Sequence, residues 1–316
     1  MASLREIKDR ISSVRSTLKI TSAMKLVASA KLRKAQRAIE GMRPYERTLA
    51  EILAAVGSGS EVPAASSRSD GNYFSDKFAE KPISAPPSAA PTHAAGEPLQ
   101  QGKTAVVAIA SNSSLCGGFN ANVIRKALEE IRACAGEVEV YPIGRKMAEA
   151  MRRAGYPSDR DYNDLIGHPA YDKSAALARS LTERYEAGEL ARVVLVYNRF
   201  VSTSSQVPTA ETYLPFAGAP GTQILGAARD DREGEYLLEP DAAALVEQLL
   251  PQVMTLRFHA AILDSAAAEQ AARTIAMQTA TDNAEDLLSE LTLEYNKGRQ
   301  QKITAEILDL LGGAAQ

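Results

Sequence analysis

The chain has 316 residues, of which 45% are hydrophobic and 24% are charged, and its formal net charge is −3 at pH 7. No apolar run approaches the roughly 18 residues that a membrane-spanning helix needs, which excludes an integral membrane protein built from such helices. Two cysteines, Cys116 and Cys134, are too few for a disulfide framework, which excludes the small secreted disulfide scaffolds.

The net charge hides a strong asymmetry along the chain. Residues 1–50 carry twelve basic side chains against four acidic ones, which makes this segment +8 and leaves −11 for the remainder. A segment of this kind usually faces something acidic. Nucleic acid, an anionic membrane surface and an acidic protein all remain open as partners at this point.

Residues 1–56 are predicted to form one long helix. Ser3 and Glu6 make a capping box, and acids this early are untypical of a transit peptide, so we expect the working protein to begin at Met1. A heptad seam runs through sixteen positions, of which thirteen are apolar, and this length indicates a coiled coil. The seam consists of Leu4, Ile7, Ile11, Val14, Leu18, Thr21, Lys25, Ala28, Leu32, Ala35, Ile39, Met42, Glu46, Leu49, Leu53 and Val56.

Two features of this helix need further explanation. Pro44 interrupts the pattern, and we expect a bend or a local weakening there. Ile20, Met24, Leu26 and Val27 lie off the main seam, in a stretch that is also rich in Lys and Arg. Something other than a single partner helix must cover these apolar side chains, or they face a close-fitting wall that adheres weakly.

Residues 57–103 shift in composition to Gly, Ser, Pro and Ala. Such a stretch cannot bury enough apolar surface to offset its ordering entropy, so we predict a disordered low-complexity insertion. Residues 72–78, NYFSDKF, are its one candidate docking motif. A regulatory brake, a docking tail and no role at all remain open for the insertion.

Residues 104–240 are predicted to form a doubly wound, Rossmann-like α/β domain. Short β-branched runs at 104–110, 138–143 and 192–198 alternate with helical spacing at 119–134, 145–154 and 172–187. Strands that alternate with helices indicate a parallel sheet. The segments 206–216 and 235–240 are expected to add a strand and to lead out of the domain.

Residues 241–316 return to helical spacing, with an interruption expected at Pro251 and a stop at Gly312 and Gly313. Their seam carries small and polar residues in its middle, where Leu would be usual, so a partner helix can come close. The predicted fold is therefore α/β, with a long antiparallel coiled coil of the N- and C-terminal helices and a globular domain at one end. The second seam consists of Val253, Leu256, Ala260, Leu263, Ala267, Gln270, Thr274, Met277, Thr281, Ala284, Leu288, Leu291 and Tyr295.

Several segments could carry chemistry, and each also has a plain structural interpretation. The stretch SNSSLCGGFNANV at 111–123 follows a strand and opens a helix, but it lacks both glycine-rich phosphate-binding patterns, so Gly117 and Gly118 are interpreted as a tight turn. Cys116 is interpreted as a core residue. The three histidines lack ligand spacing, so no metal and no cofactor are expected.

The basic run between residues 25 and 37 is either a solvated helical face or a surface for an acidic protein, because it lacks the interleaved aromatic residues that stack on bases. From a different class, the layout of helix, domain and helix also suits a coiled-coil tether or a nucleic-acid clamp. That alternative predicts a stable dimer or salt-sensitive DNA binding by the isolated chain.

Three blocks in this order resemble the gamma subunits, the central shafts, of bacterial F-type ATP synthases: ITSAMKLVASAKLRKAQ, SLCGGFN and the stretch from Ser265 to Ala315. The last block contains the pattern ITAEILDLLGGA. The resemblance covers nearly everything except the 57–103 insertion, which precedes the first strand and contains no cysteine, unlike the regulatory insertion of chloroplast relatives.

The resemblance implies a non-catalytic rotor that couples ion flow through a membrane ring of c subunits to ATP synthesis and hydrolysis. Its implied partners are three alpha and three beta subunits, the epsilon subunit and the c-ring, on the cytoplasmic face of a bacterial inner membrane, with no nucleic acid. The implied contacts with the alpha–beta ring fall on Met24, Lys25, Arg273, Arg299, Gln300 and Thr304.

Overall fold

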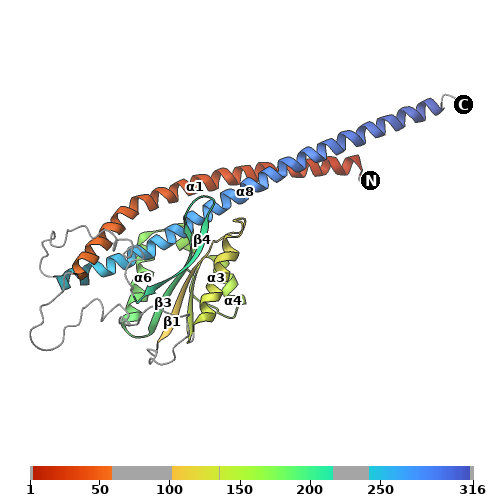
Figure 1. Ribbon diagram of the computed structural model, residues 1–316. Coiled ribbons are helices and arrows are strands. Elements are labelled where there is room, and N and C mark those ends of the chain that lie inside the picture. The colour runs from red at the N-terminus through yellow and green to blue at the C-terminus, as the bar shows by residue number, and fades with distance from the viewer. Residues whose placement is uncertain (1–2, 59–101, 135, 216–241, 314–316) are drawn as a thin grey trace, which may run out of the picture.

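We describe a computed structural model of the chain, which covers residues 3–58, 102–134, 136–215 and 242–313. Two long helices lie side by side, α1 at Leu4–Ser58 and α8 at Ala242–Gly313, with a sheet domain against one end of the pair (Figure 1). We call the pair of helices the rod. The predicted insertion at 57–103 lies almost entirely outside the described residues. Its motif at 72–78 and the segment at 235–240 lie entirely outside them.

The sheet contains four strands in the order β2-β1-β3-β4. β1 (Lys103–Ile109) pairs in parallel with β2 (Val138–Ile143) on one side and with β3 (Leu190–Phe200) on the other. β4 (Gln206–Leu214) runs antiparallel to β3. The parallel strands are joined through helices, whereas only residues 201–205 join β3 to β4, a connection too short for a crossover.

Helices cover both faces of this sheet, as the doubly wound prediction requires. α3 (Phe119–Ala133) and α4 (Arg145–Arg153) pack on one face, where Val106 and Ala108 meet Val123 and Met147. The other face packs against α5 (Asn163–Gly167), α6 (Tyr171–Glu186) and α8 itself. The C-terminal helix of the rod is thus also a layer of the domain, and the two parts share one hydrophobic core.

The predicted seams are the surfaces along which the two helices of the rod meet. Every α1 seam residue from Leu4 to Leu49 is buried or half-buried, and so is every α8 seam residue from Val253 to Tyr295. α1 continues through Pro44 and curves in its C-terminal half (Figure 1). The predicted fold class is confirmed by this arrangement.

The interruption predicted at Pro251 is wrong, because α8 passes through it without a break. Thr255 Oγ1 donates to the carbonyl oxygens of Pro251 and Gln252, both at 2.9 Å, and so adds side-chain hydrogen bonds in the turn after the proline. The short helix α5 was not predicted, since five residues are too few to show a helical period.

Candidate functional site

The register of the rod is fixed by polar pairs in its middle. Thr281 Oγ1 donates to Thr21 Oγ1 at 3.0 Å, and both side chains are buried. One turn further along α1, Lys25 Nζ donates to Gln278 Oε1. Residue numbers rise on α1 while they fall on α8, so the helices are antiparallel. Three of these four residues, Thr21, Lys25 and Thr281, occupy seam positions at which an ordinary coiled coil would place Leu. Together with Gln278 they give the rod a polar layer where hydrogen bonds select one register.

Next to this polar layer, α1 exposes apolar side chains. Ile20 is 60% exposed, Leu26 is 70% exposed and Val27 is 57% exposed, whereas Met24 is half-buried. α8 covers only the seam face of α1 here, so these residues point away from the rod. Met24 thus lies at the edge of an exposed apolar band on α1, which consists of Ile20, Leu26 and Val27, whereas Lys25 lies on the seam and bonds to Gln278.

The C-terminal part of α8 projects beyond the start of α1. A Cβ atom added at Gly298 would lie 3.0 Å from Leu4 Cδ2, so Gly298 is level with the first turn of α1. The helix then continues to Gly313, about 22 Å further at 1.5 Å per residue. We call residues 299–313 the tip. Arg299, Gln300 and Thr304 all lie on it and all are exposed.

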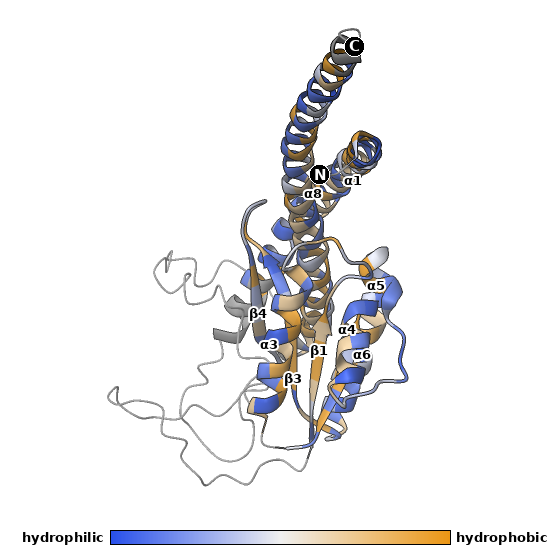
Figure 2. Ribbon diagram, turned by 90° about the vertical axis from the view of Figure 1, so that its right-hand side faces the viewer, coloured by the Kyte–Doolittle hydropathy of each residue, from blue (hydrophilic) through white to orange (hydrophobic). Residues whose placement is uncertain are grey.

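The tip combines polar and apolar side chains on a helix that nothing in the described chain covers. Figure 2 shows this mixture along the projecting end of α8. Ile303, Ile307 and Leu308 are 47%, 49% and 63% exposed. Isolated exposed apolar residues are ordinary, but a row of them on a projecting helix indicates a surface that binds another chain.

The loop between β1 and α3, residues 110–118, contains the predicted turn. Gly117 has φ +56°, in the left-handed region that glycine adopts without a Cβ penalty. Gly118 is the residue before the first turn of α3. Leu115 also has a positive φ, +67°, and its side chain is 57% exposed. A bulky residue in this conformation is strained, so its surroundings must hold the loop in place.

This loop packs directly on α8. Cys116 and Phe119 form a buried apolar cluster with Ala268 and Ala272. The Cys116 thiol also lies 3.2 Å from Asn120 Nδ2, which donates to it. Cys116 is therefore placed as a packing residue at the joint between the domain and the rod.

Arg273 lies on α8 beside the same loop, and only 11% of its side chain is exposed. Its Nη1 donates to Glu269 Oε1 at 2.6 Å, while its Nη2 donates to Ser113 Oγ at 2.7 Å and to the Ser114 carbonyl oxygen at 3.5 Å. Burial raises the pKa of Glu269, and the adjacent Arg273 guanidinium opposes that shift. We call Arg273, Glu269, Ser113 and Ser114 the Arg273 network. Its contacts with Ser113 and Ser114 were not predicted, because those residues are about 160 positions away in the sequence.

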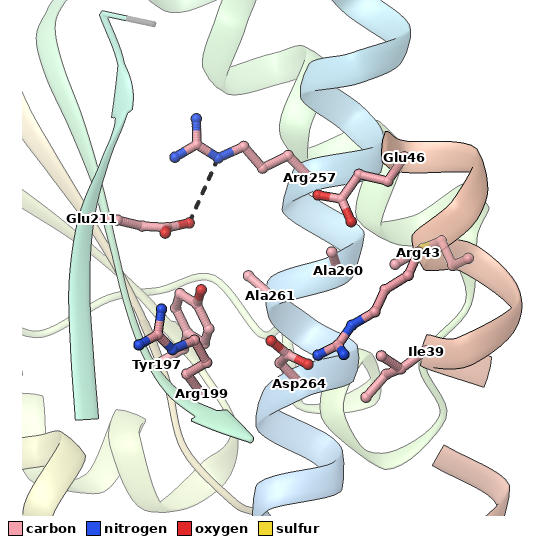
Figure 3. Close-up of a pocket in the computed structure, with 11 residues that line it drawn as sticks. Ile39, Arg43, Glu46, Tyr197, Arg199, Glu211, Arg257, Ala260, Ala261 and Asp264 are labelled. Carbon is pink, nitrogen blue, oxygen red and sulfur yellow. Dashed lines mark ion pairs between the residues drawn. The ribbon is translucent and has the colours of Figure 1, made fainter. Parts of the chain in front are cut away.

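A charged cavity of about 280 Å³ lies where α1, α8, β3 and β4 meet (Figure 3). Arg257 and Glu211 approach to 3.8 Å across it, and Figure 3 shows the Arg43 guanidinium directed toward Asp264. Its charged lining comes from α1 (Arg43, Glu46), α8 (Arg257, Asp264), β3 (Arg199) and β4 (Glu211).

Two carboxyl groups of the cavity, those of Asp264 and Glu46, have raised pKa values. Burial raises the pKa of Asp264 from 3.8 to about 6, against the opposing effect of Arg43 and Arg199. Burial and the negative charge of Asp264 raise the pKa of Glu46 as well. Neither the cavity nor the Arg273 network was predicted. Two features of the sequence could have indicated the cavity: Glu46 lies on an apolar seam, and Asp264 lies in a run of apolar residues.

The six residues assigned to ring contacts are thus distributed over three places. Met24 and Lys25 lie at the polar layer of the rod, Arg299, Gln300 and Thr304 lie on the tip, and Arg273 lies at the joint with the domain. Within the described ranges, no group of three or more His, Cys, Asp or Glu side chains could hold a metal ion. No described helix is both long enough and apolar enough to cross a membrane.

Comparison with known proteins gives a consistent set of relatives. The family described as ATP synthase matches residues 3–316. The ATP synthase gamma chain of Phocaeicola vulgatus is 44% identical over 99% of both chains, and that of Bacteroides fragilis is 43% identical over 99% of both chains. The gamma chain of Pelotomaculum thermopropionicum is 38% identical over 100% of this chain and 99% of its own length.

Solved structures share the fold at lower identity. A chain from the Euglena gracilis mitochondrial ATP synthase, in a structure of its OSCP, F1 and c-ring parts, matches with a TM-score of 0.59 at 20% identity and covers 99% of this chain and 93% of its own. A chain from the central stalk and c-ring of the Tetrahymena thermophila enzyme matches with a TM-score of 0.55 at 23% identity and covers 83% of this chain and 99% of its own.

Proposed function

Because this chain belongs to the ATP synthase family as a gamma chain, a non-catalytic subunit of the central stalk of F-type enzymes, we propose that its rod turns inside the ring of alpha and beta subunits through the contacts described below. The observation that supports the proposal best is the exposed apolar band around Met24, next to a polar layer at which the two helices are already paired. The two helices of the rod already cover each other's seams, so the apolar side chains on the outer surface are available to a surrounding ring of subunits.

The first proposed contact is made by Met24 and Lys25. Met24 offers an apolar, unbranched side chain that adapts to a changing surface. Lys25 is tied to Gln278, so its positive charge stays near the seam of the rod. An acidic loop of a beta subunit at this level would meet an apolar surface bordered by cations. Exposed ion pairs contribute about 0–1 kcal/mol each, so they favour an orientation without preventing rotation.

The second proposed contact is made by the tip. Arg299, Gln300 and Thr304 carry hydrogen-bonding groups along an exposed length of α8. Thr304 Oγ1 donates to the Gln300 carbonyl oxygen at 2.9 Å, and the hydroxyl oxygen can still accept a bond from a partner. Polar contacts of this kind form and break as the rod turns. The ring contact of Arg273 also stays a prediction, although the hydrogen bonds described above join Arg273 to its own chain.

The proposed mechanism is mechanical coupling without a catalytic group on this chain. The rod is asymmetric about its axis, because its two helices differ in sequence and the exposed apolar side chains Ile20, Leu26 and Val27 lie on α1. Each beta subunit therefore meets a different surface at each angle. Differential contact with two conformations shifts their populations and so shifts their nucleotide affinities. Rotation converts one pattern of affinities into the next.

At the other end of the rod, the sheet domain is proposed to carry the contacts with the epsilon subunit and with the membrane ring of c subunits. The chain is a subunit of a membrane-associated complex. For this sequence, with its relatives among bacterial gamma chains, we propose the cytoplasmic face of the bacterial inner membrane.

The variant Met24→Lys tests the first contact. A second cation beside Lys25 disturbs the apolar band, so ATP-driven ion pumping by the complex in vesicles should fall several-fold while the complex still assembles. The matched control is Gly41→Lys, the same addition at an exposed α1 position where a new Cβ meets open space. Equal pumping by Met24→Lys and the unmodified enzyme would refute this contact.

A pull-down with the tagged chain tests the assembly itself. The expected result is co-purification of two larger nucleotide-binding subunits in equal amounts, each in excess over this chain. Recovery of the chain as a dimer of itself, or with nucleic acid that salt releases, would contradict the proposed partners.

A further inference from the structure

The loop at residues 110–118 occupies the place where doubly wound sheets usually bind ligands. β1 lies between β2 and β3, and the chain leaves it toward β2 and later returns on its other side to form β3. The carboxyl end of such a strand opens a crevice in which small molecules bind in many proteins of this fold class. In this chain α8 lies against that crevice, and the loop packs on α8.

The fit between the loop and α8 depends on small residues. Ala268, Ala272 and Ala276 follow one another at intervals of four and so share one face of α8. The first two pack against Cys116 and Phe119. A Cβ added at Gly117 would lie 3.8 Å from the Ala276 Cβ, an ordinary contact distance. An alanine face permits this close approach, but its methyl groups are too small to interlock with the loop and prevent it from sliding along α8.

The Arg273 network supplies directional contacts beside this smooth surface. Arg273 bonds to the loop through Ser113 and Ser114 and to its own helix through Glu269. Two of the five loop residues from Ser113 to Gly117 have positive φ, and one of them is Leu115. Backbone strain of this kind persists only where the surrounding structure holds it, so the loop is fixed by its contacts with α8.

We propose that the loop and the Arg273 network form a torsional joint, which transmits torque between the sheet domain and the rod, with Arg273 as its positioning residue. The inference rests on the proposed function, since a joint of this kind matters only in a rod that turns. Torque applied to the domain pushes the loop sideways across the alanine face of α8. The bonds of Arg273 to Ser113 and Ser114 join the loop to α8, so they must break before the loop can move along the helix.

The test compares Ser113→Ala, Arg273→Ala and the double variant in the complete enzyme in vesicles. Ser113 lies on the domain loop, so Ser113→Ala should leave the rate of ATP hydrolysis unchanged. The number of ions pumped per ATP should fall by about two- to thirtyfold, the range by which one network residue changes a coupling. The double variant should add little to the single ones, because both remove the same contact. Ser113→Thr, which retains the hydroxyl, should restore pumping.

A reversible cross-link gives an independent measurement. The separation of 3.8 Å between a Cβ at position 117 and the Ala276 Cβ is the usual one for a disulfide. Gly117→Cys with Ala276→Cys, in an Arg273→Ala background, should recover pumping when oxidised and lose it again when reduced. Peptide mapping separates the intended bond from one that involves Cys116.

Two results would overturn the proposal. The first is a loss of pumping in Arg273→Ala with none in Ser113→Ala, because Arg273 would then act on the ring instead of the loop. The second is a failure of the mapped cross-link to restore pumping. Neither result depends on Met24→Lys, so a failure of the ring contact at Met24 and a failure of the joint are told apart.

Discussion

Single residues in this chain are polar at positions where packing alone would favour apolar ones. Asp264 lies beside Leu263 and Ala266 on α8, and burial raises its pKa to about 6. An unfolded aspartate has a pKa near 3.8, so the folded chain holds more protons than the unfolded chain between pH 3.8 and pH 6. The free energy of unfolding therefore falls as the pH rises through this window, and the full cost of the charge is present above pH 6.

The variant Asp264→Asn should remove that cost. At pH 7.5 the free energy of unfolding of the chain should rise by roughly 2–3 kcal/mol at most, from about 1.4 kcal/mol for each pH unit of the shift. The gain should shrink as the pH is lowered toward about 4. Denaturant titrations at several pH values measure it, with Asp286→Asn, the same change at an exposed α8 position, as the control. A gain that does not depend on pH would show that ionisation of Asp264 is not its cause.

Long-range residue contacts were beyond what the sequence could predict. Gly117 was identified from its place after a strand, and it does have the positive φ that a tight turn requires. The partners of Arg273 could not be found in this way, because hydrogen bonds between a loop and a distant helix leave no periodic pattern in the sequence. The charged lining of the cavity is likewise assembled from four separate elements.

At the scale of elements, prediction succeeded where a pattern repeats over many turns. Both seams of the rod and the strands β1, β2 and β3 were located from periodicity and β-branched runs. Prediction failed at Pro251, where we expected the proline to interrupt the helix. Tertiary packing keeps α8 continuous there. The projecting tip was missed too, because its seam positions end at Tyr295 and nothing in the pattern marks the absence of a partner helix.

Deletion of the tip separates its role in binding from any role in folding. A chain that ends at Gly298 loses residues 299–308, all of which are exposed, and the last turns of α8. Its melting temperature should stay within about 2 °C of the full chain, as is usual for changes at exposed sites. Its affinity for the alpha and beta subunits should fall, because the apolar and polar groups of the tip are gone.

A full-length variant, Ile303→Ser with Ile307→Ser, keeps the backbone of the tip and removes two exposed apolar side chains. It shows whether those side chains or the length of the helix carries the binding. Unchanged affinity in the truncated chain would contradict a ring contact at Arg299, Gln300 and Thr304. Thermal unfolding and binding titrations are the two measurements.

At the scale of the whole molecule, charge is divided unevenly between the N-terminal helix and the remainder of the chain. The basic excess of the first fifty residues lies on α1, whose side chains at Lys31, Arg33, Lys34 and Arg37 are exposed. The sheet domain instead carries the shared core and many paired charges, such as Arg184 with Glu139 at 2.9 Å. The exposed cations of α1 thus flank Leu32, which packs on α8 at the level of Leu263 and Ala267.

The charge of α1 should appear in the rate of assembly. The association rate of the chain with the alpha and beta subunits should fall as salt rises, since the screening length shortens from about 10 Å at 0.1 M to about 3 Å at 1 M. The variant with Gln at Lys31, Arg33, Lys34 and Arg37 should associate more slowly at low salt and respond less to added salt. Equal salt dependence in both chains would show that these four cations do not guide the encounter.

The pairs Thr21–Thr281 and Lys25–Gln278 have a consequence that reaches far from their own position. By choosing which turn of α1 lies opposite which turn of α8, they also set how far the free end of α8 extends. A shift of one heptad between the helices would lengthen or shorten that reach by about 10 Å. The length of α8 that extends beyond α1 without a partner helix is therefore decided by a few hydroxyl and amide groups near the midpoint of the rod.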